Sequence, residues 1–549
     1  MGKIEKNTLF YGDNLDILRN YIEDESVDLI YLDPPFNSNR SYNVLFKDES
    51  GIDSEAQITA FDDSWHWGDT AEETYYELIN KSSPEIANLI SALRQLIGNN
   101  QMMAYLVMMT IRLQELRRVL KNNGSIYLHC DPTASHYLKI LLDVIFGGEN
   151  FRNEIIWRRT SAHSDSIQGN VIHMGRVHDV ILFYSKSNEA QREEIFIPYS
   201  EDYINKFYRL IDENGRKYTL DNITGPGGAS KGNPFYEFLG VSRYWRYSRE
   251  KMQELFEQGR IKQTKPGNVP RYVRYLDEMP GVPLQDIWDD VLPIQSQSLE
   301  RLGYPTQKPL SLLERIIMTS SNEGQIVLDP FSGCGTAIAA AQKLGRRWIG
   351  IDITYLAIAL HKSRLKDMFG LEPKKDYDVI GEPLSIHDAN QLAKDNRFQF
   401  EWWALSLIEA RPAGEKKKGS DKGIDGIISF TDEAKGNVKQ ILVQVKSGKV
   451  NSGLIRDFRG TIERENNAVM GVFITLENST KDMDIEALEA GYYVSPYTNQ
   501  KYRKIQIFTI EDLLTRKTPD LPQVATYKTF KKAEKVKKDK KAEQGKLVI

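Results

Sequence analysis

The sequence predicts an α/β protein with more than one domain, and three observations support this prediction. Short apolar runs that end in acids, such as "SVDLIYLD" and "NGSIYLHCD", are typical of buried strands in a parallel sheet. The stretch "GQIVLDPFSGCGT" reads as a further strand that ends in a glycine-rich turn, and "AIAAAQKLG" follows as a helix that stops at Gly345. "RRWIGIDI" is the next strand. A strand, a glycine-rich turn, a helix and a strand that ends in an acid form a nucleotide-binding βαβ unit.

Length and composition limit the classes of protein to which the chain can belong. With 549 residues, 40% hydrophobic and 27% charged, it is expected to form two to four ordinary globular domains. The net charge of −4 excludes a uniformly basic nucleic-acid coat but allows a local basic groove. The two cysteines, Cys130 and Cys334, form no CxxC pair, which argues against a disulfide framework or a cysteine zinc site. Without an apolar leader or a run of about 18 apolar residues, a cytoplasmic location is expected.

The pattern of elements changes along the chain and suggests domain boundaries. A first domain is expected over residues 1–380. Residues 187–286 interrupt it, because this stretch is rich in Tyr, Arg and Gly and lacks the strand–helix rhythm. A smaller unit is expected over residues 381–517, with a helix over 388–410 and strands in "GIDGIISF" and "KQILVQVKS". The remainder, 518–549, is Lys-rich and nearly free of apolar residues, so we expect a disordered tail.

The glycine-rich turn is a candidate ligand site. Asp329 ends the strand before it, and Gly333 and Gly335 would let the backbone approach a ligand closely. The N-terminus of the following helix would point N–H groups at that ligand. Asp352 ends the next strand, where such folds bind ribose hydroxyls. An ordinary strand-to-helix turn is the alternative interpretation, and the lack of a GxGxxG motif disfavours a dinucleotide.

Four short stretches occur in an order that is informative. They are "YGDNLDIL" at 11–18, "DPPF" at 33–36, "GYPTQKPLSLLERII" at 303–317 and "FSGCGT" at 331–336. Together they resemble the motifs of DNA amino-methyltransferases. The catalytic motif precedes the interrupting region and the cofactor motif follows it, an order that resembles the beta class, including type III modification subunits. The resemblance covers roughly residues 7–364 and implies an S-adenosylmethionine-dependent methyltransferase (Rossmann-like) domain.

The resemblance also implies a set of cofactor contacts. The residues implied are Asp13, Thr306, Lys308, Asp329, Phe331, Gly333, Gly335 and Asp352. Asp13 would approach the adenine of S-adenosylmethionine, and Thr306 and Lys308 would lie at its carboxylate end. The four around the glycine-rich turn would hold the methionine part, and the last would accept hydrogen bonds from the ribose hydroxyls. A solvated lysine and a plain strand-end acid are the alternative interpretations of Lys308 and Asp352.

The "DPPF" stretch suits methyl transfer to an exocyclic amine. The target base must leave the duplex, and the lone pair of its amine is delocalised into the ring. Asp33 and the carbonyl of Pro34 could accept hydrogen bonds from the two N–H groups and free that lone pair. Pro34 and Pro35 lack backbone donors that would compete for these acceptors. Phe36 offers a flat face for the flipped base. A turn with prolines at its corners is the alternative interpretation.

The family pattern also bears on the target base and its sequence. An acid at position 33 resembles adenine N6 enzymes, whereas cytosine N4 enzymes more often carry Ser there, so adenine is expected and cytosine is the alternative. The family places its target-recognition region where residues 187–286 interrupt the first domain. Arg243, Trp245 and Arg246 fit contacts with bases and phosphates. They fit the packing of a small subdomain equally well.

The smaller unit carries a second set of motifs. "LIEARPAGEKKKGSDKGIDGIISF" is followed by "KQILVQVKSG", and the pair resembles PD-(D/E)xK nucleases of the Mrr-like restriction group over roughly residues 382–517. The resemblance implies that Asp425 and Gln444 bind Mg²⁺ and that Lys446 stabilises charge or orients water. Glu409, expected on the preceding helix, would add an acid. Because Gln444 replaces an acid, an inactive unit is an alternative.

The expected protein is therefore a site-specific DNA adenine methyltransferase with a C-terminal α/β restriction-endonuclease-like domain. The resemblance implies a role in restriction–modification or phage defence. Double-stranded DNA is the implied partner, a homodimer is compatible with it, and no membrane partner is expected. One alternative is a methyltransferase whose C-terminal unit binds DNA or a partner without cutting. A catalytically dead DNA-binding protein is another, and the intact Asp33 and Gly333 argue against it.

Overall fold

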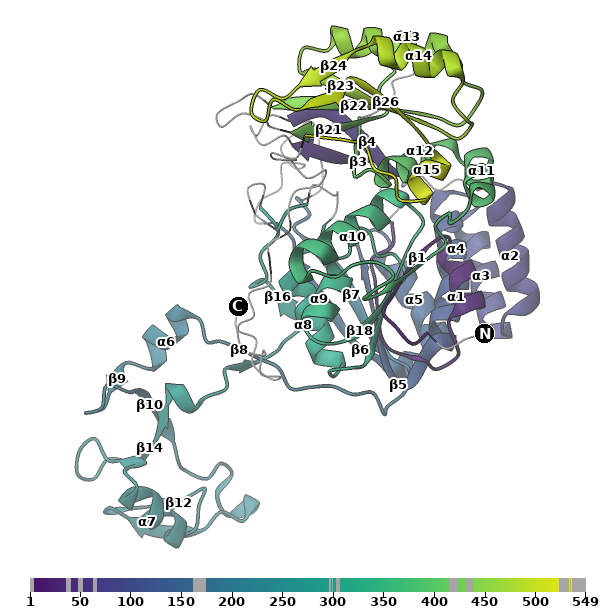
Figure 1. The fold of residues 1–549 in the computed structure, drawn as a ribbon. Coiled ribbons are helices and arrows are strands. Elements are labelled where there is room, and N and C mark those ends of the chain that lie inside the picture. Colours follow the sequence, from purple (N-terminus) through teal and green to yellow (C-terminus); the bar gives the residue numbers. More distant parts are fainter. Residues whose placement is uncertain are drawn as a thin grey trace. The chain divides into compact units, whose positions relative to one another are not determined.

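The computed structural model shows two compact units (Figure 1). One comprises Met1–Arg192 and Asp286–Asp539, and the main segment of the other is Glu193–Gln285. The structure describes residues 4–35, 67–160, 174–295, 298, 300–302, 307–413, 423–430, 438–522, 533 and 535, and the backbone of 41–47 and 53–62. Within these residues no helix has the length and apolar character needed to cross a membrane.

A nine-stranded mixed sheet forms the centre of the larger unit, and its strands run mostly parallel. All neighbouring strands pair in parallel except at β7, which is antiparallel to both of its neighbours. This sheet confirms the predicted α/β fold class. The strand order is β16 (Ile287–Trp288), β6 (Phe151–Arg158), β7 (His178–Ser185), β5 (Leu120–Cys130), β2 (Val27–Leu32), β17 (Ile326–Asp329), β18 (Arg347–Asp352), β1 (Thr8–Tyr11) and β19 (Asp378–Ile380).

The pairing of β2 with β17 joins segments about 300 residues apart in the chain. Leu29 pairs with Val327, and Ile30 pairs with Leu328. The buried Asp28 reinforces this junction, because one carboxylate oxygen accepts a hydrogen bond from the backbone N–H of Ile326 at 2.9 Å. Its other oxygen accepts from Lys121 at 2.7 Å, which ties β5 to the same point.

Helices cover both faces of the sheet (Figure 1). The helices α1 (Asn14–Tyr21), α4 (Gln101–Val119) and α5 (Ser135–Phe146) lie on one face, and α8 (Leu310–Ser320), α9 (Thr336–Lys343) and α10 (Tyr355–Phe369) lie on the other. The helices α2 (Asp69–Lys81) and α3 (Pro84–Ile97) pack on the outer side of α4. The first half of α4 is therefore buried on nearly every side. A short 3₁₀ turn, η1 (Gly148–Asn150), precedes β6, and β3 (Ser41–Lys47) and β4 (Asp53–Asp62) form an antiparallel pair.

The C-terminal part of the larger unit has its own five-stranded sheet. Its order is β20 (Arg411–Pro412), β21 (Gly426–Phe430), β22 (Lys439–Lys446), β23 (Ala468–Thr475) and β26 (Ile505–Thr509). The helices α11 (Ile386–Asp395), α12 (Arg397–Ser406), α13 (Ser452–Arg464), α14 (Lys481–Glu489) and α15 (Ile510–Leu514) pack around it, beside the hairpin of β24 (Tyr492–Val494) and β25 (Lys501–Arg503). The single helix predicted over 388–410 is two helices, because Asn396 is extended and caps α12.

The C-terminal part is joined to the nine-stranded sheet through the start of α10. Tyr355, in the first turn of α10, packs into the hydrophobic core of the C-terminal part. Its backbone N–H donates to the side-chain oxygen of Gln399 on α12 at 3.0 Å. Its ring also stacks on Tyr11 at the end of β1, with 3.7 Å between ring centroids. A residue of α12 thus completes the hydrogen bonding at the N-terminus of α10.

The unit Glu193–Gln285 has a small core of its own, built from Ile223, Phe238, Trp245, Met252, Leu255 and Ile261. Trp245 is fully buried, so of its two interpretations, contact with DNA and packing of the subdomain, packing is correct. Arg243 and Arg246 are exposed on either side of it. The elements of this unit are β8 (Phe196–Ile197), α6 (Glu201–Phe207), β9 (Leu210–Ile211), β10 (Lys217–Asn222), η3 (Gly228–Lys231), β11 (Phe235–Phe238), β12 (Val241–Tyr244), α7 (Arg249–Glu257), β13 (Ile261–Lys262), β14 (Arg271–Tyr275), η4 (Leu276–Glu278) and β15 (Val282–Pro283).

Candidate active site

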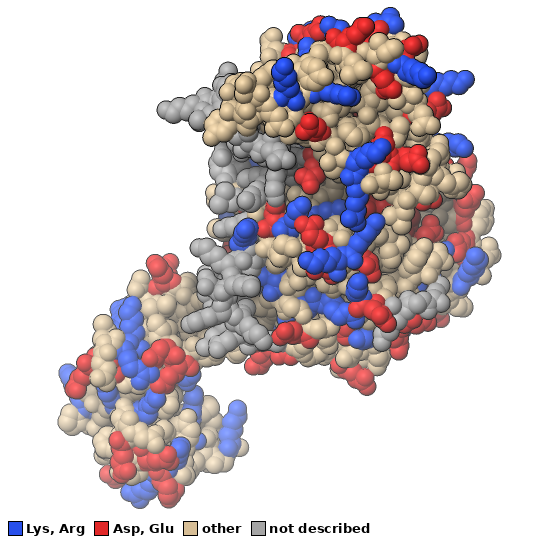
Figure 2. Space-filling view, viewed as in Figure 1, with Lys and Arg blue, Asp and Glu red and all other residues tan. Residues whose placement is uncertain are grey.

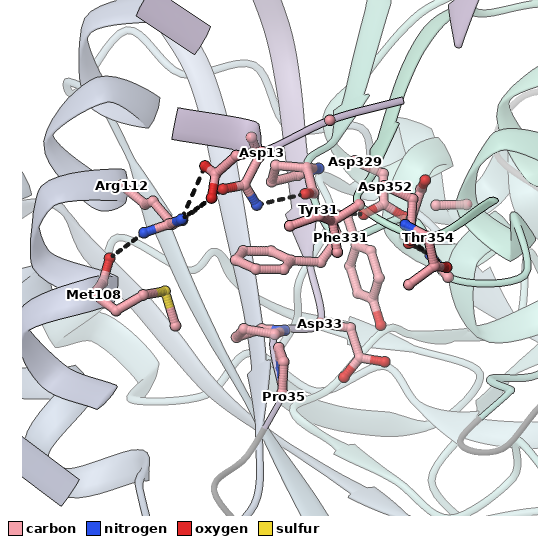
Figure 3. Close-up of a pocket in the computed structure, with 18 of the residues that line it drawn as sticks. Asp13, Tyr31, Asp33, Pro35, Met108, Arg112, Asp329, Phe331, Asp352 and Thr354 are labelled. Carbon is pink, nitrogen blue, oxygen red and sulfur yellow. Dashed lines mark hydrogen bonds and ion pairs between the residues drawn. The ribbon is translucent and has the colours of Figure 1, made fainter. Parts of the chain in front are cut away.

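A cavity of about 480 Å³ opens at the carboxyl ends of β1, β2, β17 and β18 (Figure 3). Ligands of open α/β sheets bind at this edge, where the strand order reverses. Acids that end or follow these strands line the cavity: Asp13 follows β1, Asp33 follows β2, Asp329 ends β17 and Asp352 ends β18. The strand ends thus bring together four acids that are far apart in the sequence.

The glycine-rich turn after β17 has a conformation that glycine alone adopts easily. Gly333 and Gly335 have φ angles of 50° and 76°, and Gly335 caps the N-terminus of α9. A Cβ atom on Gly335 would lie 2.9 Å from the ring of His361, so the turn also has no room for a side chain there. Nε2–H of His361 donates a hydrogen bond to the carbonyl of Gly333 at 3.1 Å. Burial lowers the pKa of His361 to about 4, which keeps the imidazole neutral.

Asp352 anchors this turn to the neighbouring strand. One of its oxygens accepts from the backbone N–H of Gly333 at 2.9 Å, and the other accepts from the N–H and hydroxyl of Thr354, both at 2.9 Å. Burial raises the pKa of Asp352 to about 6, although these hydrogen bonds act in the opposite direction. Each carboxylate oxygen can accept more than one hydrogen bond, so the group could still accept from a ligand.

Asp329 lies deepest of the acids in the cavity. It is 3% exposed and accepts a hydrogen bond from the N–H of Phe331 at 3.1 Å. Burial raises the pKa of Asp329 well above its ordinary value, and the nearby Asp33 and Asp352 add to the rise. A cationic ligand bound beside Asp329 would favour its ionised form and oppose these effects.

Asp33 forms an ion pair with Lys308 across the cavity. The ammonium of Lys308 lies 2.5 Å from one oxygen of Asp33, and both side chains are largely buried. Pro34 and Pro35 line the same wall. Lys308, which we expected at the carboxylate end of a cofactor, thus contacts the candidate catalytic acid. Phe36 and Thr306, the other two predicted residues of these segments, lie outside the described residues.

Asp13 is held by an arginine from α4. The guanidinium of Arg112 donates to both oxygens of Asp13 at 2.9 Å, and Asp13 also caps α1 by accepting from the N–H of Leu15. Arg112 further contacts Asn14, which itself donates to the carbonyl of Pro330 at 2.8 Å (Figure 3). Burial lowers the pKa of Arg112, and Asp13 opposes this effect. These contacts connect the ends of β1 and β17 on the α4 side of the cavity.

Sequence reasoning missed three residues that shape the site: Tyr31, Arg112 and His361. Tyr31 precedes Asp33 by two positions, and strand alternation alone places both side chains on the same face. Arg112 is a lone charge within the apolar stretch of α4, which is a signal for a buried partner. His361 carries no recognisable signal, because its role depends on the packing of α10 against the turn.

The predicted nuclease-like residues are only partly brought together. The strand register places Asp425 opposite Gln444, and Asp425 is buried and accepts from the N–H of Val445 at 2.7 Å. Lys446 follows on the same face at the end of β22. Glu409 is not on a helix as predicted, because α12 ends at Ser406, and its exposed side chain contacts Lys366 at 4.0 Å. Within the described residues, no three His, Cys, Asp or Glu side chains are arranged to hold a metal ion.

The mixed sheet, the glycine-rich turn and the acids at the strand ends define a Rossmann-like enzyme that binds a nucleoside-containing cofactor. The model of the DNA methylase family that comprises N6 and N4 enzymes matches residues 27–361. The chain belongs to this family and is a DNA methyltransferase.

Curated relatives agree with this assignment. The type II methyltransferase M.EcaI of Enterobacter cloacae is 31% identical over 379 residues, which cover 68% of this chain and 71% of that protein. The Mod subunit of the type III restriction-modification enzyme StyLTI of Salmonella typhimurium is 29% identical, with coverage of 62% of this chain and half of that protein. The DNA adenine methyltransferase YhdJ of Escherichia coli is 26% identical, with coverage of 67% and 86%.

A second family model matches the C-terminal part. It is described as NACHT-associated inactive Restriction Endonuclease 1, and it matches residues 401–515. This range contains the five-stranded sheet and most of the helices around it.

The pKa of Asp352 gives a testable dependence of stability on pH. Because this pKa is raised from 3.8 to about 6, the folded state binds the proton more tightly than the unfolded state. The resulting stabilisation is present below the unfolded pKa and is lost as the pH rises through about 6. Asp352→Asn does not titrate, so its free energy of unfolding should fall less than that of the parent between acidic and neutral pH. Urea unfolding over a pH series measures this slope.

The control for this measurement is Asp482→Asn, which changes an exposed carboxyl in the first turn of α14. Its slope should match that of the parent. If Asp352→Asn also keeps the parental slope, Asp352 does not titrate near pH 6.

Proposed function

We propose that the chain transfers a methyl group from S-adenosylmethionine to N6 of adenine in double-stranded DNA. The observation that carries this proposal is that Asp33 and Pro34 line the same cavity as Gly333 and Asp352. The residues suited to bind an amine therefore lie in the same cavity as the residues suited to bind a nucleoside cofactor. This juxtaposition is what direct transfer between two bound molecules requires.

The cavity suits S-adenosylmethionine in charge and shape. The cofactor supplies an electrophilic methyl group on a positively charged sulfur, and a cation beside Asp329 and Asp352 would favour the ionised forms of both acids. The turn at Gly333 and Gly335 lets backbone approach the ligand without side chains in between. Asp352 would accept hydrogen bonds from ribose hydroxyls, and Asp13 and Phe331 would line the two ends of the bound molecule.

Asp33 and the carbonyl of Pro34 would bind the two N–H groups of the target amine. Both acceptors draw the nitrogen toward tetrahedral geometry, and its lone pair then becomes available for attack. Lys308 supports this arrangement, because its ammonium, 2.5 Å from one oxygen of Asp33, keeps that carboxyl group in place.

Adenine is favoured over cytosine by two observations. An acid stands at the first position of the "DPPF" motif, as the resemblance to adenine N6 enzymes implies. A relative with 26% identity over two thirds of this chain is named as a DNA adenine methyltransferase. The family model covers both N6 and N4 enzymes, so cytosine N4 is the second candidate for the same site.

Replacing the candidate catalytic acid tests the proposal. Asp33→Ala removes one acceptor for the amine, so methyl transfer to adenine should fall by at least about a hundredfold, in the range of a lost positioned acid or base. Cofactor affinity should change little, because Asp33 faces the base. Radiolabel transfer to a duplex measures the rate, and nucleoside analysis of the product identifies the base.

Asp131→Ala is a matched control, because Asp131 follows the next strand of the sheet, β5, but does not line the cavity. It should keep the parental activity. Equal transfer by Asp33→Ala and the parent would overturn the role of Asp33, and N4-methylcytosine as the product would overturn only the choice of adenine.

We further propose that the unit Glu193–Gln285 recognises the target sequence. It forms a compact unit with a hydrophobic core of its own, and its exposed Arg243 and Arg246 could contact phosphates or base edges. Figure 2 shows acidic and basic side chains interleaved on the visible face of this unit, which favours selective contacts over a uniform electrostatic grip.

Exchanging this unit for that of a relative with a different recognition sequence tests its role. The chimera should methylate the sequence of the donor, because the amine-binding residues are unchanged. Sequencing of methylated positions in a host that expresses the chimera reads the outcome. A chimera that methylates the parental sequence would place recognition elsewhere in the chain.

For the C-terminal part we propose a module that does not cut DNA. A cutting site of the kind predicted needs oxygen ligands for Mg²⁺, but Gln444 supplies a neutral amide opposite Asp425. Asp425 already accepts a backbone hydrogen bond, and Glu409 is exposed on a turn. The matching family model is described as an inactive restriction endonuclease. In this proposal the module binds DNA or a partner. A Mg²⁺-dependent nuclease is the alternative.

This proposal predicts no DNA cleavage by the parent with Mg²⁺ on unmethylated, hemimethylated or fully methylated duplexes. Gln444→Glu restores a second acid beside Asp425 and is the variant most able to gain Mg²⁺ binding, which calorimetry would detect. Cleavage by the parent that is lost in both Asp425→Ala and Lys446→Ala would show that the nuclease alternative is correct.

A further inference from the structure

Behind the candidate catalytic acid lies a buried chain of three polar side chains. The hydroxyl of Tyr31 lies 3.0 Å from Nδ1 of His129, and Nε2 of His129 lies 3.3 Å from a carboxylate oxygen of Asp179. Tyr31 and Asp179 are each 3% exposed, and His129 is fully buried. Arg159 forms an ion pair with the other oxygen of Asp179 at 3.3 Å. A buried polar network of this kind is costly unless its members are paired, as these are.

The sheet itself aligns this chain with the active site. Tyr31 is on β2, His129 is on β5, and Asp179 is on β7, and these three strands are neighbours. Strand alternation places Tyr31 on the same face as Asp33, two residues further along. Tyr31 also lines the cavity, and its hydroxyl points to the side of the cavity that Asp33 occupies (Figure 3). The chain therefore begins at the cavity wall and leads away from it.

Methyl transfer to an amine creates a need for a proton acceptor. The bond from the cofactor sulfur to the methyl carbon breaks, and a bond from that carbon to the amine nitrogen forms. The nitrogen then carries a positive charge and two hydrogens, and one proton must leave. Asp33 is poorly suited to keep it, because protonation would place a neutral acid 2.5 Å from the largely buried Lys308 ammonium.

We propose that Tyr31 accepts the proton released by the methylated amine while it passes its own hydroxyl proton to Nδ1 of His129. The inference rests on the proposed methyl transfer at this site and holds for adenine N6 and cytosine N4 alike. The products are a neutral methylated amine, a neutral Tyr31 and an imidazolium at His129 beside the Asp179 carboxylate. No proton is lost or gained in this transfer, and no further reactant is required.

The surroundings of His129 support this direction of transfer. Asp179 orders the neutral imidazole with its proton on Nε2, which leaves Nδ1 as the acceptor for Tyr31. Burial raises the pKa of Asp179, but His129, Lys308 and Arg159 outweigh this effect, and the net pKa lies below its ordinary value. The Asp179 carboxylate thus remains charged and can stabilise the imidazolium that forms. Burial raises the pKa of Tyr31 well above its ordinary value, so the two proton movements must be coupled.

Tyr31→Phe removes the hydroxyl and keeps the ring. Tyr127→Phe is the matched control, because Tyr127 is an equally buried tyrosine on β5 whose hydroxyl bonds to Ser320 at 2.7 Å and does not line the cavity. Single-turnover methyl transfer at saturating cofactor and duplex should fall at least about tenfold in Tyr31→Phe, at the low end for a lost general base, and stay within about twofold of the parent in Tyr127→Phe. Cofactor affinity, measured by calorimetry, should be unchanged in both.

The pH profile separates proton transfer from a structural role. Because the route requires that His129 accept a proton, the pH dependence of the single-turnover rate should differ between the parent and Tyr31→Phe. Tyr31 and Asp179 contact His129, and Arg159, Lys308 and Asp131 interact with Asp179 in turn. In Tyr31→Phe, the part of this pH dependence that is due to His129 should be absent. Asp179→Asn should transfer the methyl group more slowly than the parent, with unchanged cofactor affinity.

Each outcome has a distinct meaning. A parent chain that transfers no methyl group would refute the proposed function itself. An active parent with an equally active Tyr31→Phe would refute the proton route alone. Equal losses in Tyr31→Phe and Tyr127→Phe, or an unchanged pH profile in Tyr31→Phe, would show that the hydroxyl matters only for the packing of the sheet.

Discussion

The parallel pairing of β2 with β17 is the interaction on which the active site depends. Two segments that begin about 300 residues apart meet through Leu29 with Val327 and Ile30 with Leu328. The buried Asp28 fixes the alignment by accepting from the N–H of Ile326 and from Lys121. A slip of one residue would turn every side chain of β2 to the opposite face of the sheet, and Asp33 would no longer face the glycine-rich turn.

The charges around the cavity are only partly neutralised. Four carboxyls line the cavity, and two of them are paired with cations: Asp33 with Lys308 and Asp13 with Arg112. Among the described residues, Asp329 and Asp352 form no ion pair, and burial raises the pKa of each of them. Binding a cation between these acids would relieve their mutual repulsion, so the same charges that destabilise the free protein contribute to cofactor affinity.

Local patterns in the sequence were sufficient to predict the strand ends. Asp33, Asp329 and Asp352 each close a short apolar run, and parallel strands deliver their carboxyl ends to one edge. The contact between Lys308 and Asp33 was beyond such reasoning, because it spans 275 positions and depends on where the segment before α8 passes over the sheet. The pairing of Asp13 with Arg112 likewise depends on the rotation of α4 about its axis.

In the C-terminal part, sequence reasoning predicted the strands more reliably than the ends of the helices. The runs at β21 and β22 are apolar and flanked by polar turns, which are clear signals. Asn396 and Glu409 were misjudged for a common reason. Asn396 is an N-cap within a helical pattern, and Glu409 has a φ angle of 53° just past a helix end. Both features depend on local backbone geometry, about which the spacing of apolar residues carries no information.

The bond from Tyr355 to Gln399 has a consequence for engineering. Thr354 caps α10 and also donates to Asp352, so the first turn of this helix is shared between the cofactor cavity and the C-terminal part. A different C-terminal domain grafted at this junction would leave one N–H of that turn without its acceptor and the ring of Tyr355 without its apolar neighbours. The C-terminal part therefore cannot be exchanged without loss of these contacts, and a chimera at this junction would have to keep helix α12 of the parent.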